Sequence, residues 1–101
     1  MKQLTSSMSQ EGNALRISGP LTIGTVSAQL DITEQLATIS IIDLAQVEAV
    51  DSAAVSLLLA WLRQAQQRSV TISFNNIPDN LLSLARLYGV AEFLPLSPAH
   101  S

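Results

Sequence analysis

Residues 47–62 read VEAVDSAAVSLLLAWL. Asp51 and Ser52 stand side by side, directly before a strongly apolar segment. Asp and Ser are preferred at helix N-caps, where a side-chain oxygen accepts a hydrogen bond from an early backbone N–H. The stretch therefore predicts a helix over residues 52–67, with this dipeptide at its start.

The apolar face of the predicted helix is wider than packing on one sheet requires. On a wheel of about 100° per residue its apolar side chains fill an arc of roughly 200°; they are Ala54, Val55, Leu57, Leu58, Leu59, Trp61, Leu62 and Ala65. A helix lying on a sheet needs a stripe of only about 100°. Two explanations stay open: the helix also packs against neighbouring helices, or the edge with Val55 and Leu59 faces a partner. Trp61 is expected in the core.

A buried strand is predicted on each side of this helix. Residues 38–44 (TISIIDL) and 70–74 (VTISF) are rich in β-branched residues and almost continuously apolar. That pattern is typical of central strands covered on both faces. A strand, a helix and a strand in this order predict a right-handed parallel crossover.

The remaining segments complete the order β-β-α-β-α-β-α. Before the crossover we expect an edge strand over 4–10, a turn at 11–13, a strand over 14–18 ended by Gly19-Pro20, and a helix over 26–36 capped by Thr25. After it we expect a helix over 79–88 stopped by Gly89, then a short strand or extended tail over 90–94. The predicted fold is α/β: a mixed, mainly parallel sheet with an antiparallel first strand and helices packed mainly on one side.

Length and composition limit the possible functions. With 101 residues the chain predicts one domain over 1–101, in which 95–101 form a flexible tail. Only five Lys and Arg residues and a net charge of −3 disfavour nucleic-acid binding. Cysteine is absent and His100 is the only histidine, so neither a metal site nor a bound cofactor is expected.

Membrane insertion and secretion are also disfavoured. The longest apolar stretch, AAVSLLLAWL, is far shorter than the roughly 20 residues that cross a bilayer. The N-terminal sequence MKQLTSSMSQEG has no apolar core of a signal peptide. We therefore expect a soluble, cytoplasmic protein.

Asp51 and Ser52 allow three interpretations. They cap the helix; or Ser52 is a nucleophile; or Ser52 is a recognition or phosphorylation point at the positive end of the helix dipole. A nucleophilic serine needs a nearby base, yet the chain has no G-x-S-x-G motif and its one histidine is His100. Catalysis is therefore not expected, and the first and third interpretations remain.

The arrangement IIDLAQVEAVDSAAVSLLLAWLRQA resembles the STAS domain family, which includes anti-sigma-factor antagonists. In that pattern a buried strand ends near Asp43, a loop follows, and Asp-Ser opens a long apolar helix. GPLTIGTVSAQL and VTISFNNIPDNLLSLARLYGV resemble the family's segments upstream and downstream. Two positions depart from the pattern: Ala54 replaces a glycine and Thr22 replaces an aspartate, which makes regulated phosphorylation of Ser52 less expected.

Within the family, the short length, the leucine-rich helix and the LARLYGV ending resemble the cytoplasmic STAS subunit of Mla-type ABC phospholipid transporters. The resemblance implies a non-enzymatic module, peripheral to an inner-membrane complex, that binds and supports the ATPase subunit and helps to maintain outer-membrane lipid asymmetry. The expected partner interface is Asp51, Ser52, Ala53, Val55, Ser56 and Leu59. The alternative is an anti-sigma-factor antagonist controlled by phosphorylation of Ser52.

Overall fold

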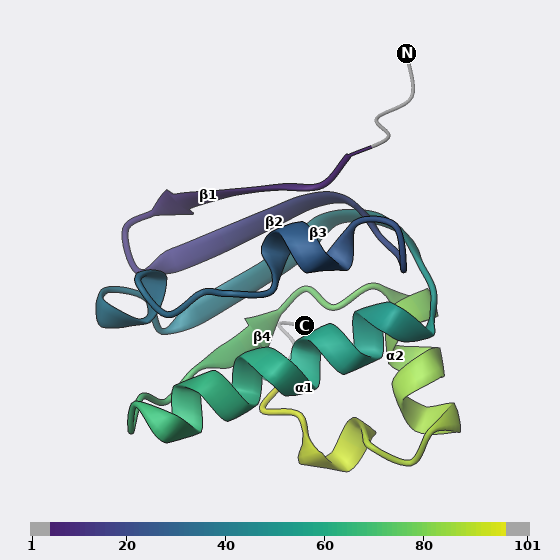
Figure 1. The fold of residues 1–101 in the computed structure, drawn as a ribbon. Helices are drawn as coiled ribbons and strands as arrows, with labels where there is room; N and C mark the ends of the chain where they lie inside the picture. Colours follow the sequence, from purple (N-terminus) through teal and green to yellow (C-terminus); the bar gives the residue numbers. More distant parts are fainter. Residues whose placement is uncertain (1–4, 97–101) are drawn as a thin grey trace.

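The computed structural model describes residues 5–96 and contains one four-stranded sheet, in the order β1-β2-β3-β4 (Figure 1). The strands are β1 (Ser7–Glu11), β2 (Ala14–Leu21), β3 (Ile41–Val50) and β4 (Ser73–Asn75). The α-helices are α1 (Ser52–Gln67) and α2 (Asp79–Leu87). Three short 3₁₀ helices are η1 (Val26–Gln29), η2 (Gln35–Ala37) and η3 (Ala91–Phe93).

The predicted fold class is confirmed. β1 pairs antiparallel with β2, whereas β2 with β3 and β3 with β4 are parallel pairs. Gly12, at φ 61°, takes a backbone conformation in the β1–β2 turn that glycine adopts without strain. The helices α1 and α2 pack on the same side of the sheet (Figure 1).

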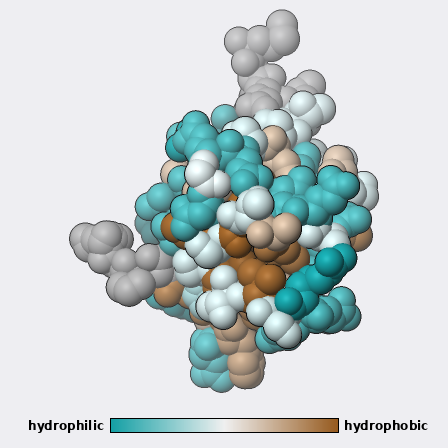
Figure 2. All heavy atoms as spheres, turned by 90° about the vertical axis from the view of Figure 1, so that its left-hand side faces the viewer, coloured by the Kyte–Doolittle hydropathy of each residue, from teal (hydrophilic) through white to brown (hydrophobic). Residues whose placement is uncertain are grey.

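The core lies between this face of the sheet and α1. Alternate residues of β2, among them Leu15, Ile17 and Leu21, are at most 1% exposed. Trp61 of α1 is fully buried, as predicted, and its Nε1 donates a hydrogen bond to the carbonyl of Gln29 at 2.9 Å. At the end of the molecule where α1 finishes, a patch of apolar side chains is exposed and is surrounded by polar ones (Figure 2).

β3 differs from the prediction in length and in burial. The strand continues to Val50, through residues expected in a loop, because β2 pairs with it along that length. Between Arg16 and Ser18, and again between Gly19 and Leu21, the pairing with β2 shifts by one, so β3 contains two extra, bulged residues. The burial of β3 alternates as far as Leu44 and is then irregular, and one face stays partly exposed. The prediction of burial on both faces is therefore wrong.

The ends of β2 and β4 also differ from the prediction. β2 continues past Gly19-Pro20 to Leu21. Pro20, which has no N–H to donate, lies beyond Ser18, the last residue paired with β1, and inside the register shift with β3 between Gly19 and Leu21, where proline is tolerated. β4 is shorter than expected because its pairing with β3 begins only at Ser73.

The predicted helix over 26–36 is wrong, since the segment forms two separate 3₁₀ turns, η1 and η2. Between η1 and η2 the backbone makes hydrogen bonds to side chains in place of helical hydrogen bonds. Gln64 of α1 accepts a hydrogen bond from Ile32 N–H and donates one to the carbonyl of Leu30. Asp31 accepts a hydrogen bond from Thr33 N–H, which also competes with helical bonding. Hydrogen bonding from the Thr33 side chain, and then from its backbone N–H, lowers the pKa of the Asp31 carboxyl.

At the C-terminal end, residues 90–94 contain η3 in place of the expected strand or extended tail. Phe74 N–H then donates to the carbonyl of Pro95 at 2.9 Å, and Leu96 forms a parallel bridge with Phe74. The first residues of the expected tail are thus attached to β4, while 97–101 lie outside the described residues. Leu4, the first residue of the expected edge strand, also lies outside them.

Candidate functional site

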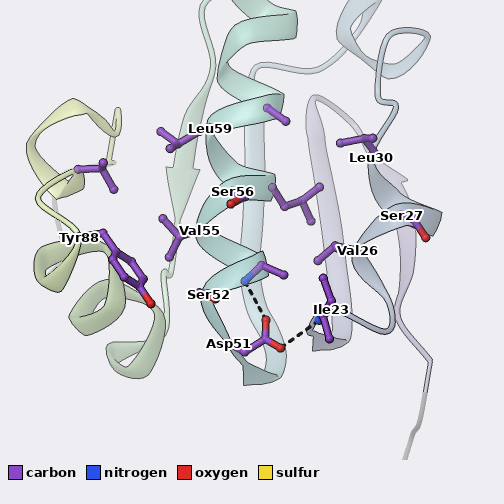
Figure 3. Close-up of a pocket in the computed structure, with 14 residues that line it drawn as sticks. Ile23, Val26, Ser27, Leu30, Asp51, Ser52, Val55, Ser56, Leu59 and Tyr88 are labelled. Atoms are coloured by element: carbon purple, nitrogen blue, oxygen red, sulfur yellow. Dashed lines mark hydrogen bonds between the residues drawn. The ribbon is translucent and has the colours of Figure 1, made fainter.

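An open groove of about 930 Å³ runs along the N-terminal half of α1, and we call it the α1 groove (Figure 3). One wall comes from the segment after β2, the floor from α1 and the other wall from the residues after α2. Its lining residues are Ile23, Val26, Ser27, Leu30, Asp51, Ser52, Ala53, Val55, Ser56, Leu57, Leu59, Ala60, Tyr88 and Val90.

Asp51 organises the end of this groove. It is the N-cap of α1, with extended backbone angles, and its Oδ1 accepts a hydrogen bond from Ala53 N–H at 2.8 Å. Its Oδ2 accepts a second hydrogen bond from Ile23 N–H at 3.0 Å. The capping interpretation is therefore correct for Asp51. The same carboxylate also ties the loop after β2 to the start of the helix (Figure 3).

Ser52 is the first residue of α1, and its side chain is exposed. Ser56 follows one turn later and is exposed as well. Ala53 and Leu59 are half-buried, whereas Val55 is only 4% exposed. The six residues expected at a partner interface thus all line one groove.

The wide apolar arc of α1 has a structural explanation. The helix is in contact with α2 and with η1, and its buried side chains belong to the same core cluster as those of the sheet. Val55 belongs to the hydrophobic core, and the half-buried Leu59 packs against it. Packing between neighbouring helices, the first of the two explanations left open, therefore accounts for much of this arc.

Eight groove residues were not in the expected interface. Leu57 and Ala60 lie on α1, and the other six lie on the two walls: Ile23, Val26, Ser27, Leu30, Tyr88 and Val90. Ile23 is 79% exposed and Tyr88 is 52% exposed, values unusual for such large side chains. A sequence signal existed for Ile23, an isolated isoleucine between turn-forming residues in LTIGT. None existed for Tyr88, which reads as an ordinary helix-end residue.

The described lining of the groove provides surface for contact but few side chains that could take part in a reaction. Asp51 is the one acidic residue among the described residues that line the groove, and both of its oxygens accept backbone hydrogen bonds. Within residues 5–96 the lining has no Lys, Arg or His beside Ser52 to act as a base. Over residues 5–96 no three His, Cys, Asp or Glu side chains are grouped as metal ligands would be. None of the helices in that range has the length and apolarity to cross a membrane.

Comparison with known proteins places this geometry in a family. The family model described as "Mlab, STAS domain" matches residues 4–96. Two relatives, from Escherichia coli (strain K12) and Shigella flexneri, are each named "Intermembrane phospholipid transport system binding protein MlaB". Each is 30% identical over 88 residues, which cover 85% of this chain and 91% of the relative.

Among solved structures, the anti-sigma factor antagonist SpoIIAA in its unphosphorylated form has the same fold. Its TM-score is 0.66 at 14% identity, over 92% of this chain and 88% of that one. The resemblance drawn from Asp51-Ser52 and the segments around it is thereby confirmed, and this chain belongs to the STAS domain family, in the group described as Mlab, STAS domain.

Proposed function

We propose that this protein is a non-enzymatic binding module of an Mla-type ABC phospholipid transporter, in which it docks on the cytoplasmic ATPase subunit and supports it. Such a system would serve to maintain the lipid asymmetry of the outer membrane. The name shared by the two relatives, a binding protein of an intermembrane phospholipid transport system, supports the transport role. The docking role rests on the α1 groove.

The observation that carries the docking role is the exposed apolar rim of the groove. Ile23 and Tyr88 stand on opposite walls, largely exposed, with the exposed Ser52 between them at the start of α1 (Figure 3). Covering apolar surface contributes about 25 cal/mol per Å². A protein surface that fills the groove would gain from both walls and could hydrogen-bond the Ser52 hydroxyl.

Co-purification tests the proposal directly. The chain is expressed together with the ATPase of its own transporter, and the ATPase carries the affinity tag. The two proteins are expected to elute together at a fixed ratio. Leu59→Arg, which places a charge on the groove floor, should abolish co-elution. Leu62→Arg is the matched control: Leu62 is half-buried on the same helix but does not line the groove. Elution of the ATPase alone in the wild-type experiment would contradict the proposal.

A second candidate function is that of an anti-sigma-factor antagonist switched by phosphorylation. The observation in its favour is the exposed hydroxyl of Ser52 on the first residue of α1, where the helix dipole favours a phosphate. Incubation with candidate kinases and ATP, followed by mass spectrometry, separates the two functions. One phosphate per chain on Ser52 that releases the bound partner would favour this alternative.

A further inference from the structure

The wall of the α1 groove formed by the segment after β2 has little regular structure of its own. η1 is a single 3₁₀ turn of four residues, Val26–Gln29, and no side chain caps its N-terminus. A helix this short is not stable by itself. The position of Val26 and Leu30, which line the groove, therefore depends on whatever holds this segment against α1.

Asp51 holds the start of this segment through Ile23, and Gln64 attaches its far end with both ends of its side-chain amide. Its Nε2 donates a hydrogen bond to the carbonyl of Leu30 at 2.8 Å, and its Oε1 accepts one from Ile32 N–H at 2.9 Å. A carbonyl and an N–H that flank one residue are the same pair of groups that a neighbouring β-strand would bind. The Gln64 amide thus makes the two hydrogen bonds that one residue of a neighbouring β-strand would make to Leu30 and Ile32.

Trp61, one helical turn before Gln64, extends the attachment. Its Nε1 donates to the carbonyl of Gln29 at 2.9 Å in a buried position. The two α1 side chains together bind three backbone groups within residues 29–32. Gln64 itself is not among the lining residues, whereas Leu30 is 46% exposed on the groove wall.

We propose that Gln64 is a positioning residue for partner binding: its amide fixes Leu30, and so holds the apolar wall of the α1 groove in the geometry that the partner recognises. This inference rests on the proposed function, because it takes the groove as the docking face. Gln64 acts through Leu30 and does not itself contact the partner.

The first experiment uses the isolated chain and needs no partner. Gln64→Met keeps the length and helix preference of the side chain and removes both hydrogen bonds. Hydrogen exchange of the Ile32 amide should accelerate, and the emission of Trp61, the only tryptophan, should shift. Gln66→Met is the matched control, since Gln66 is exposed on the same helix. An unchanged Ile32 exchange rate in Gln64→Met would overturn the inference.

The second experiment measures the dissociation constant for the tagged ATPase, well below the unfolding temperature. Gln64→Met should weaken binding by about fivefold or more, whereas Gln66→Met should leave it unchanged. Gln64→Glu is a second variant. Its carboxylate can still accept from Ile32 N–H but places an oxygen where the Leu30 carbonyl needs a donor, so it should weaken binding too.

A double-mutant cycle separates positioning from a general loss of stability. If Gln64 acts through Leu30, then Gln64→Met should cost little further affinity in a Leu30→Ala background. Fully additive losses would overturn the inference, as would equal binding by wild type and Gln64→Met. Failure of the wild-type chain itself to bind the ATPase is a distinct outcome: it contradicts the proposed function, and the inference fails with it.

Discussion

Asp51 shows how one side chain can serve both the fold and the site. Its two carboxylate oxygens bind the Ala53 and Ile23 amides, so it caps α1 and fixes the exposed Ile23 at the mouth of the groove. The sequence predicted the cap, because Asp before an apolar helical run is a local signal. It could not predict the bond to Ile23, which lies 28 residues away.

Asp51→Ala should therefore cost more stability than loss of a simple cap. Removal of an N-cap costs about 1 kcal/mol, and up to about 2 kcal/mol in unfavourable cases. With the Ile23 bond lost as well, we expect a loss near the upper value in the free energy of unfolding, measured with urea. Asp79→Ala is the control, since Asp79 is an exposed acid in the first turn of α2 and makes no cap there. Equal losses in both variants would contradict this role of Asp51.

Ser52→Glu should separate folding from binding. A negative charge in the first turn of a helix stabilises by about 0.3–1 kcal/mol, so the melting temperature should stay the same or rise. Binding to the ATPase should weaken, because a charged and larger side chain enters the apolar groove. The control is Ser83→Glu, at an exposed serine of α2 that does not line the groove. Intact binding by Ser52→Glu would remove Ser52 from the interface.

At the scale of elements, α1 ends in a conformation that its sequence does not favour. Ser69, just after the helix, has φ 57°, and Val70 N–H bonds back to the carbonyl of Ala65. Glycine is the usual residue at such a C-terminal position because a Cβ is strained there. Ser69→Gly should raise the free energy of unfolding by up to about 1 kcal/mol.

Asn76 is the comparison for this prediction. It has nearly the same φ, 58°, but its side chain donates a hydrogen bond to Asp43 at 3.0 Å. Asn76→Gly would relieve backbone strain and lose that bond, so its net effect should be small. Both variants are compared by chemical unfolding. Destabilisation by Ser69→Gly would show that the strain argument does not apply here.

The elements that the sequence predicted best are those determined locally. α1 follows from a cap and a long apolar periodicity, and α2 from Pro78, Asp79 and a stop at Gly89. The helix predicted over 26–36 failed because its backbone bonds to side chains of Trp61 and Gln64, more than 30 residues later. No local sequence pattern predicts such hydrogen bonds.

The predicted ends of the strands were wrong for a related reason. The length of β3 and its bulges depend on the register with β2, and one face of the sheet stays partly exposed. An apolar run of residues indicates that a strand exists, but only its partners decide where it ends. The candidate site was predictable along α1, where the six expected interface residues between Asp51 and Leu59 all line one groove. Its two walls, which include Ile23 and Tyr88, became visible only in the structure.

At the scale of the whole molecule, one side of the sheet carries the helices and the groove. Charge plays a small part in this arrangement. The ion pair between Arg16 and Glu11, at 3.0 Å, is partly exposed on β2 and β1, and such pairs contribute about 0–1 kcal/mol. Asp51 is the one charged side chain among the described residues that line the groove, so the proposed docking would be driven by apolar contact. Its affinity should depend only weakly on salt between low and physiological ionic strength.

The most direct test of docking through the α1 groove compares two variants of one helix. Ser56 and Gln66 are both exposed on α1, but only Ser56 lines the groove. The dissociation constant for the purified ATPase is measured by calorimetry for the wild type, Ser56→Arg and Gln66→Arg, after thermal unfolding has shown that all three are folded. We predict that Ser56→Arg weakens binding at least about tenfold, the effect of 1.4 kcal/mol, and that Gln66→Arg binds like the wild type. Equal affinity of the two variants would contradict docking through the α1 groove.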